Sequence, residues 1–213
     1  MRVMADGQRP AMTHKNLFRT MLQVFSALWA LCFLARAVMM RIGSLAGSWF
    51  GSPTYYVTLL AFEGLILFGI LVFLWSRSLE KKSSRLLMLL SSVVMVITGL
   101  WGTYSNLAVV RIHLALNYKL SLLPFLPLTA IFWLAPVLMG VWPLLLSIGS
   151  LVQTKTHRKM AIILLAIALI NAVLLLNTAF YNIGANLLGP ISTFLPALYV
   201  ACFALFLHSE RSR

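Results

Sequence analysis

The residue with the clearest capacity for unusual chemistry in this sequence is Glu63. It lies within an apolar run that begins near Tyr55, about eight residues or roughly 12 Å along a helix. A lone carboxylate in an apolar environment is costly, so we expect Glu63 to be protonated or paired with a cation. The whole chain of 213 residues has only four acidic side chains: Asp6, Glu63, Glu80 and Glu210.

Arg36 is the candidate partner of Glu63, because it lies near the end of the preceding apolar run at a comparable depth. The sequence therefore predicts a Glu63–Arg36 pair. Glu63 could then serve as a relay for protons or cations, as ionisable residues inside membrane segments often do. The structural alternative is a simple ion pair or a neutral, hydrogen-bonded acid, and we favour this alternative.

Two asparagines belong to the same candidate intramembrane polar site as Glu63 and Arg36. Asn171 lies near the middle of a later apolar run, and Asn177 lies nearer its end. Such side chains often hydrogen-bond between helices, which is the more common role, but they can also line a path for a polar solute.

A second candidate is a polar cluster that consists of Arg111, His113 and Asn117. These residues alternate loosely with apolar ones over residues 105–119, a pattern typical of an amphipathic helix lying on a membrane surface. If the chain were an enzyme acting on lipid, this cluster would be the place for its chemistry. We lean towards a protein that is not an enzyme.

Other familiar chemistries are not supported by the sequence. The histidines lie outside the centres of the apolar runs, so paired haem ligands are not expected. Cys32 and Cys202 lie inside apolar runs without the spacing of zinc or redox motifs. Phosphate-binding loops, catalytic serine elbows and zinc-protease motifs do not occur either. We therefore expect no cofactor and no metal.

The composition indicates that lipid is the solvent for most of this chain. Hydrophobic residues make up 61% and charged residues only 10%, with a mean hydropathy of +0.94. Soluble domains are about 45–50% apolar and about 25% charged. The length suits one compact bundle of helices, so the predicted fold class is an all-α, polytopic transmembrane helical bundle.

Six segments are long and apolar enough to be candidate spans, since a span needs about 20 residues. They are 17–40, 55–75, 86–104, a less certain one within 120–151, 160–181 and 187–207. The predicted organisation is a tail at 1–16, a six-helix membrane domain at 17–207 and a second tail at 208–213.

The basic residues predict the orientation of these spans. One side of the six-span arrangement carries thirteen lysines and arginines in the tails and in the second–third and fourth–fifth connections, and the other side carries four. The four are Arg36, Arg41, Arg111 and Lys119. Basic connections stay in the cytoplasm, so both termini are expected there. The net charge of +13 then indicates contact with anionic lipid headgroups rather than nucleic acid.

The fourth segment is unusual because it contains four prolines, at positions 124, 127, 136 and 143. Proline removes a helix hydrogen bond and kinks or ends the helix. Two interpretations follow: a short re-entrant or interfacial piece over 120–128 before a kinked span, or one long, tilted and kinked helix. We favour the second.

The sequence narrows the function only to a class. The shortage of proton-transfer groups favours a small transport or channel-type protein, or an accessory subunit that works with a membrane or cytoplasmic protein partner. The alternative is a non-transporting membrane module, such as a sensor, an immunity factor or an assembly factor. The expected location is the bacterial cytoplasmic membrane.

Overall fold

The computed structural model describes residues 14–43, 53–118, 134–177 and 185–210, and these residues form six α-helices and no strands. The helices are α1 (His14–Gly43), α2 (Pro53–Ser76), α3 (Lys82–Tyr118), α4 (Leu134–Gln153), α5 (Arg158–Leu176) and α6 (Ala185–Ser209). The prediction of an all-α helical membrane bundle is thereby confirmed.

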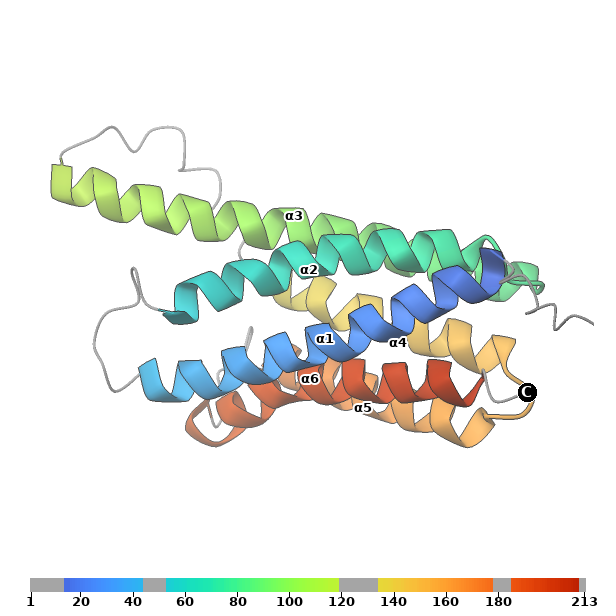
Figure 1. The fold of residues 1–213 in the computed structure, drawn as a ribbon. Helices are drawn as coiled ribbons and strands as arrows, with labels where there is room; N and C mark the ends of the chain where they lie inside the picture. The colour runs from blue at the N-terminus through green and yellow to red at the C-terminus, as the bar shows by residue number, and fades with distance from the viewer. Residues whose placement is uncertain (1–13, 44–52, 119–133, 178–184, 211–213) are drawn as a thin grey trace, which may run out of the picture.

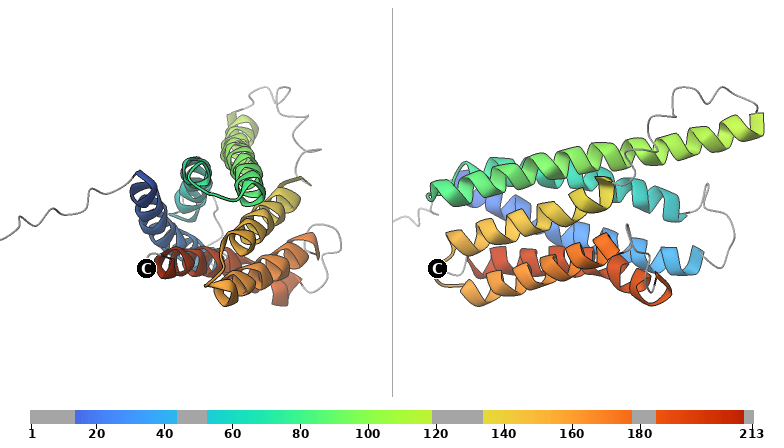
Figure 2. Two further views of the ribbon diagram at one scale, coloured as in Figure 1. Left: turned by 90° about the vertical axis from the view of Figure 1, so that its right-hand side faces the viewer. Right: turned by 180° about the vertical axis from the view of Figure 1, so that it is seen from behind.

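The six helices run roughly along one common direction (Figure 1). Each helix packs against the next in the sequence, and α6 returns to pack against α1. The end-on view in Figure 2 shows this ring, with the helices following one another in chain order. Helices joined by short connections therefore lie antiparallel and adjacent, as is usual in bundles.

The first residue of α1, the last of α6 and the connections 77–81 and 154–157 all lie at one end of the bundle (Figure 1). This end, which we call the basic end, carries most of the described lysines and arginines. The arrangement agrees with an even number of passes, while the placement of the basic end in the cytoplasm stays a prediction.

Four of the helices have stretches long and apolar enough to cross a membrane: Asn16–Met39, Tyr56–Ser76, Lys82–Tyr104 and Arg158–Leu176. Two shorter apolar stretches, Val137–Gln153 and Phe194–Ser209, belong to α4 and α6. Many large apolar side chains point outward from the bundle, such as Leu28, Leu67 and Val173. Outward leucines and valines are the expected surface of a protein surrounded by lipid.

The predicted surface helix over residues 105–119 is wrong. Residues 105–118 continue α3 without a break, which makes a helix of 37 residues, about 55 Å long. The sequence after Gly102 contains neither glycine nor proline up to Tyr118, so nothing interrupts the backbone hydrogen bonds. In Figure 1 this part of α3 extends beyond the ends of the other helices.

The fourth predicted segment is observed as α4, which has 20 residues and includes Pro143. The two interpretations of the proline-rich stretch differ over 120–128, which lies outside the described residues.

An aromatic cluster fills the centre of the ring. Trp29 of α1 packs against Phe68 of α2 and Trp142 of α4, with ring centroids 4.8 and 6.2 Å apart. Phe203 of α6 meets Phe68 edge-on at 5.8 Å. Buried aromatic pairs contribute about 0.5–1.5 kcal/mol beyond their burial, so this cluster ties four of the helices together.

Gly64 allows the closest approach within this cluster. Trp29 lies directly over the α2 backbone and donates its Nε1–H to the carbonyl of Ala61 at 3.1 Å. A Cβ atom at position 64 would lie 2.6 Å from Trp29 Nε1, which is too close. Only glycine leaves room for the indole at this point of α2.

Basic side chains cap two helices at the basic end. Arg19 of α1 donates two hydrogen bonds to the carbonyl of Leu207, at 2.9 and 3.2 Å, near the last turn of α6. Lys81 donates to the carbonyl of Val152 in the last turn of α4. A helix C-terminus carries partial negative charge, so these cations stabilise the helices that end here.

We expect Gly64→Ala to destabilise the bundle by about 1–3 kcal/mol, because Trp29 must move out of the aromatic cluster. Thermal unfolding in detergent micelles measures this loss. The matched control is Leu67→Ala, one turn away on the outward face of the same helix, which should change the melting temperature little. Equal melting temperatures for the two variants would contradict this account of the core.

Candidate functional site

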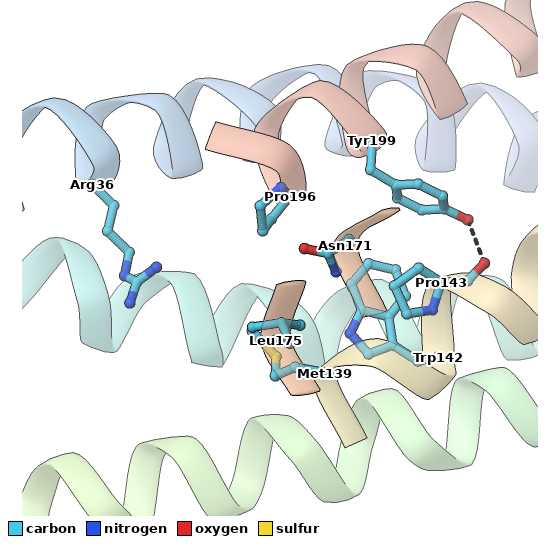
Figure 3. Close-up of a pocket in the computed structure, with 8 residues that line it drawn as sticks. All are labelled: Arg36, Met139, Trp142, Pro143, Asn171, Leu175, Pro196 and Tyr199. Carbon is cyan, nitrogen blue, oxygen red and sulfur yellow. Dashed lines mark hydrogen bonds between the residues drawn. The ribbon is translucent and has the colours of Figure 1, made fainter. Parts of the chain in front are cut away.

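A cavity of about 120 Å³ lies inside the bundle between α1, α4, α5 and α6 (Figure 3). It lies near the middle of the bundle, with Arg36 towards the end away from the basic end and Tyr199 towards the basic end. The residues that line it are Arg36, Met139, Trp142, Pro143, Asn171, Leu175, Pro196 and Tyr199.

Pro143 weakens α4 beside this cavity. Proline has no N–H, so the carbonyl of Met139, four residues earlier, loses its helical partner. Pro196 has the same effect on α6 from the other side of the cavity. Two helices that pack around one space thus both have an interrupted hydrogen-bond ladder there.

Tyr199 and Ser91 hold the weakened part of α4 in place. The Tyr199 hydroxyl donates to the Pro143 carbonyl at 2.9 Å and also contacts the Ser147 hydroxyl at 2.9 Å. From the opposite side, Ser91 of α3 donates to the Trp142 carbonyl at 2.8 Å. These bonds connect α4 to α6 and α3, so the wall of the cavity has a fixed shape.

Arg36 brings a positive charge to the cavity. It is partly buried, and among the described residues it makes one hydrogen bond, from Nε to the Thr58 hydroxyl at 3.3 Å. None of the other seven lining residues is charged. The guanidinium therefore lacks a compensating anion among the groups that line the cavity with it.

Two further buried polar atoms at the cavity lack a hydrogen-bond partner. They are the Nε1–H donor of Trp142, which is 2% exposed, and the Oδ1 acceptor of Asn171, which is 3% exposed. A buried polar group without a partner costs about 1–3 kcal/mol, and most native structures satisfy such groups with protein or water. In Figure 3 the Asn171 oxygen points towards the side of the cavity where Arg36 lies.

The predicted Glu63–Arg36 pair is wrong. Arg36 bonds to Thr58, and no ion pair joins it to Glu63 in the described part of the chain. Five residues of helix separate Thr58 from Glu63, which turns the two side chains about 140° apart around the axis of α2. Glu63 is consequently exposed on the outer surface of the bundle, whereas Thr58 is buried.

The other predicted site residues have different outcomes. Asn171 and Arg36, two members of the predicted intramembrane polar site, line the same cavity. Asn177 is the C-cap of α5 and is not among the lining residues. The backbone places Arg111, His113 and Asn117 on the far part of α3, but their side chains lie outside the described residues. Their role as an outer cluster stays a prediction.

Sequence reasoning missed the aromatic part of the site. Trp142 and Tyr199 lie in apolar segments, where aromatic residues usually belong to the core. The proline-rich fourth segment was the available signal, because a proline inside a membrane helix frees a backbone carbonyl that other groups must satisfy.

Metal binding has no support in the described residues, where no three His, Cys, Asp or Glu side chains lie close enough to share an ion. The expectation of no cofactor is not tested by this finding. Comparison with protein-family models, with curated proteins and with solved structures gives no match for this chain. Its function must therefore be argued from the cavity and from the surface of the bundle.

We expect Tyr199→Phe to lower the stability by about 1–2 kcal/mol, because α6 loses its buried hydroxyl bonds to the Pro143 carbonyl and the Ser147 hydroxyl of α4. The measurement is again thermal unfolding in micelles. Tyr104→Phe is the control, since Tyr104 is exposed at the surface. A Tyr199→Phe protein as stable as the control would show that α4 does not depend on these hydrogen bonds.

Proposed function

We propose that this protein is a small membrane-embedded solute-binding protein of the transport or channel type, whose solute enters the cavity between α1, α4, α5 and α6. The observation that carries the proposal is the combination of Arg36, Trp142 and Asn171 around one internal space. Binding sites in membrane bundles are built in this way, from a few polar side chains on facing helices.

The energetics support a wet or occupied cavity over a dry one. A cation and two unpartnered polar atoms within a membrane bundle are expensive, and such residues are normally kept for a function. Water or a solute in the space would supply the missing hydrogen bonds. A space that stayed empty would leave the cost of all three groups uncompensated.

The two proline breaks support the same proposal. Pro143 and Pro196 both border the cavity, so the backbone of two helices is interrupted where a solute would sit. Interrupted helices at membrane depth are tolerated where they line a water-filled cavity or are buried in protein, and transporters often bind their substrates at such interruptions. Leu175 and Met139 supply the apolar part of the lining.

The proposed location is the bacterial cytoplasmic membrane, with both termini in the cytoplasm. The basic end would then face inward, and the Arg36 side of the cavity would lie in the outer half of the membrane. Solute would reach Arg36 from the outside.

We expect a cysteine in place of Met139 to react with a charged, membrane-impermeant thiol reagent added outside intact cells, because water reaches the cavity from that side. Cys32 and Cys202 are replaced by alanine beforehand. Leu146→Cys is the matched control on the same helix, since Leu146 is fully buried and does not line the cavity.

The two variants distinguish a wet cavity from a packed interior. Labelling at position 139 alone supports the proposal. An unreactive position 139, tested with reagent on each side of the membrane in turn, would contradict it.

A second function, that of an accessory subunit bound to another membrane protein, is favoured by Glu63. It belongs to an outward stripe on α2 whose other members are apolar, at the spacing of one helix face. The stripe consists of Tyr56, Leu60, Glu63, Leu67, Ile70 and Phe73. Near the middle of a span, a carboxyl that faces lipid is costly, and a polar group of a partner helix would satisfy it.

We expect a photo-crosslinking residue at position 67 to capture a neighbouring protein in the membrane, and Glu63→Leu to reduce that capture several-fold. The control position is Leu169, which is outward on α5 and lies away from the stripe. If position 67 captured only lipid, or if Glu63→Leu left the protein adduct unchanged, the accessory role would lose its support.

A further inference from the structure

We propose that the cavity recognises an oxyanion, namely a phosphate or carboxylate group, through the guanidinium of Arg36. This inference rests on the proposed solute-binding function and names the chemical class of the solute. It follows from the sign of the charge, the hydrogen-bond groups, the size of the cavity and its depth.

The charge at the cavity has one sign. Arg36 is the charged lining residue, and arginine stays protonated even in unfavourable surroundings. Glu63, the acid of the neighbouring helix α2, faces away on the outer surface. A neutral solute would leave the guanidinium charge uncompensated, whereas an oxyanion compensates it with charge-assisted hydrogen bonds.

The hydrogen-bond groups at the cavity also suit an oxyanion. Arginine has five N–H donors in a planar fork, and only the one at Nε is used, by Thr58, among the described residues. Across the cavity from Arg36, Trp142 has a buried N–H donor without a partner, which remains for water or for another part of the solute (Figure 3). The unpartnered Asn171 oxygen can accept a hydrogen bond from a hydroxyl group of the ligand, such as the P–OH group of monohydrogen phosphate.

The volume limits what the cavity can hold. About 10–15 Å³ of such space already accepts one water, so 120 Å³ accepts several waters or one group the size of a phosphate. Sites for drug-sized ligands are about 300–1,000 Å³. The cavity therefore fits the anionic group of a molecule and excludes a whole nucleotide.

The depth of the site allows two sources for this group. Arg36 lies seven residues before the end of α1 at Gly43, which is about 10 Å of helix. A free anion from the aqueous side could reach this depth, and so could the headgroup phosphate of an anionic lipid entering between helices. Both sources present the same oxyanion to the same donors.

The test uses the full-length protein and one substitution, Arg36→Gln. In nanodiscs of phosphatidylcholine, inorganic phosphate is titrated at constant ionic strength and thermal unfolding is followed. In a second arm, native mass spectrometry measures phosphatidylglycerol retained by the protein after extraction from mixed lipid. Arg77→Gln is the matched control, because it removes the same charge from an exposed arginine beyond the end of α2.

We expect a saturable rise in melting temperature with phosphate, retention of phosphatidylglycerol, or both, in the wild-type and Arg77→Gln proteins. Arg36→Gln should weaken the response by about tenfold or more, since losing one partner of a buried charged contact has effects of that size. A rise in melting temperature with inorganic phosphate identifies a free anion as the ligand. Retention of phosphatidylglycerol without such a rise identifies a lipid headgroup.

Two observations keep a folding defect apart from a binding defect. Without phosphate or anionic lipid, Arg36→Gln should melt no lower than the wild type, because it removes a buried and uncompensated cation. Arg36→Lys keeps the charge and should recover part of the response. If Arg36→Gln lowered the melting temperature in ligand-free nanodiscs and Arg77→Gln did not, Arg36 would have a structural role. The inference would then be wrong.

The inference also fails if neither arm distinguishes Arg36→Gln from Arg77→Gln. In that event, thiol labelling of the Met139→Cys variant still tests the proposal that the cavity binds a solute. A reactive cysteine would leave a solute-binding cavity for ligands of another class, and an unreactive one would remove the cavity as a binding site.

Discussion

The constraint on which this structure depends is that a bundle surrounded by lipid must satisfy its polar groups from within. Water is not present in the hydrocarbon region to bond to a free carbonyl or amide. The bundle meets this demand with side chains that cross between helices, such as Ser84 to the Gly149 carbonyl and Ser91 to the Trp142 carbonyl. Each of these bonds fixes one helix against its neighbour.

Around the cavity, the same constraint is met only in part. Tyr199 donates to the Pro143 carbonyl, yet Trp142 Nε1 and Asn171 Oδ1 remain without partners at a cavity that also holds a positive charge. These unmet groups lie together and on different helices, while the nearby aromatic core is well packed. Two of the buried atoms that lack a partner in the described residues thus line one cavity that also holds a cation, and water or a ligand in that cavity would complete their hydrogen bonds.

The sequence predicted the helices well because apolar length and basic flanks are local signals. It did not predict which way Glu63 points, because α2 is apolar around its whole circumference and no polar face indicates the inward side. Grouping Arg36 with Asn171 in one polar site needed only their places along apolar segments, whereas the other residues that line the cavity with them depend on how α1, α4, α5 and α6 pack, which the sequence pattern does not encode. The sequence placed the end of the third span at Tyr104, as observed, but it did not predict that the helix itself continues to Tyr118, because an interfacial tyrosine does not stop a helix.

The most direct test of this account is an experimental structure of the full-length protein in lipid nanodiscs, determined at a resolution that shows ordered water. We predict ordered density for water or an anion between Arg36, Trp142 and Asn171, with Pro143 still bonded to Tyr199. A collapsed space, in which Asn171 and Trp142 bond to protein groups and Arg36 extends to the lipid headgroups outside the bundle, would contradict it.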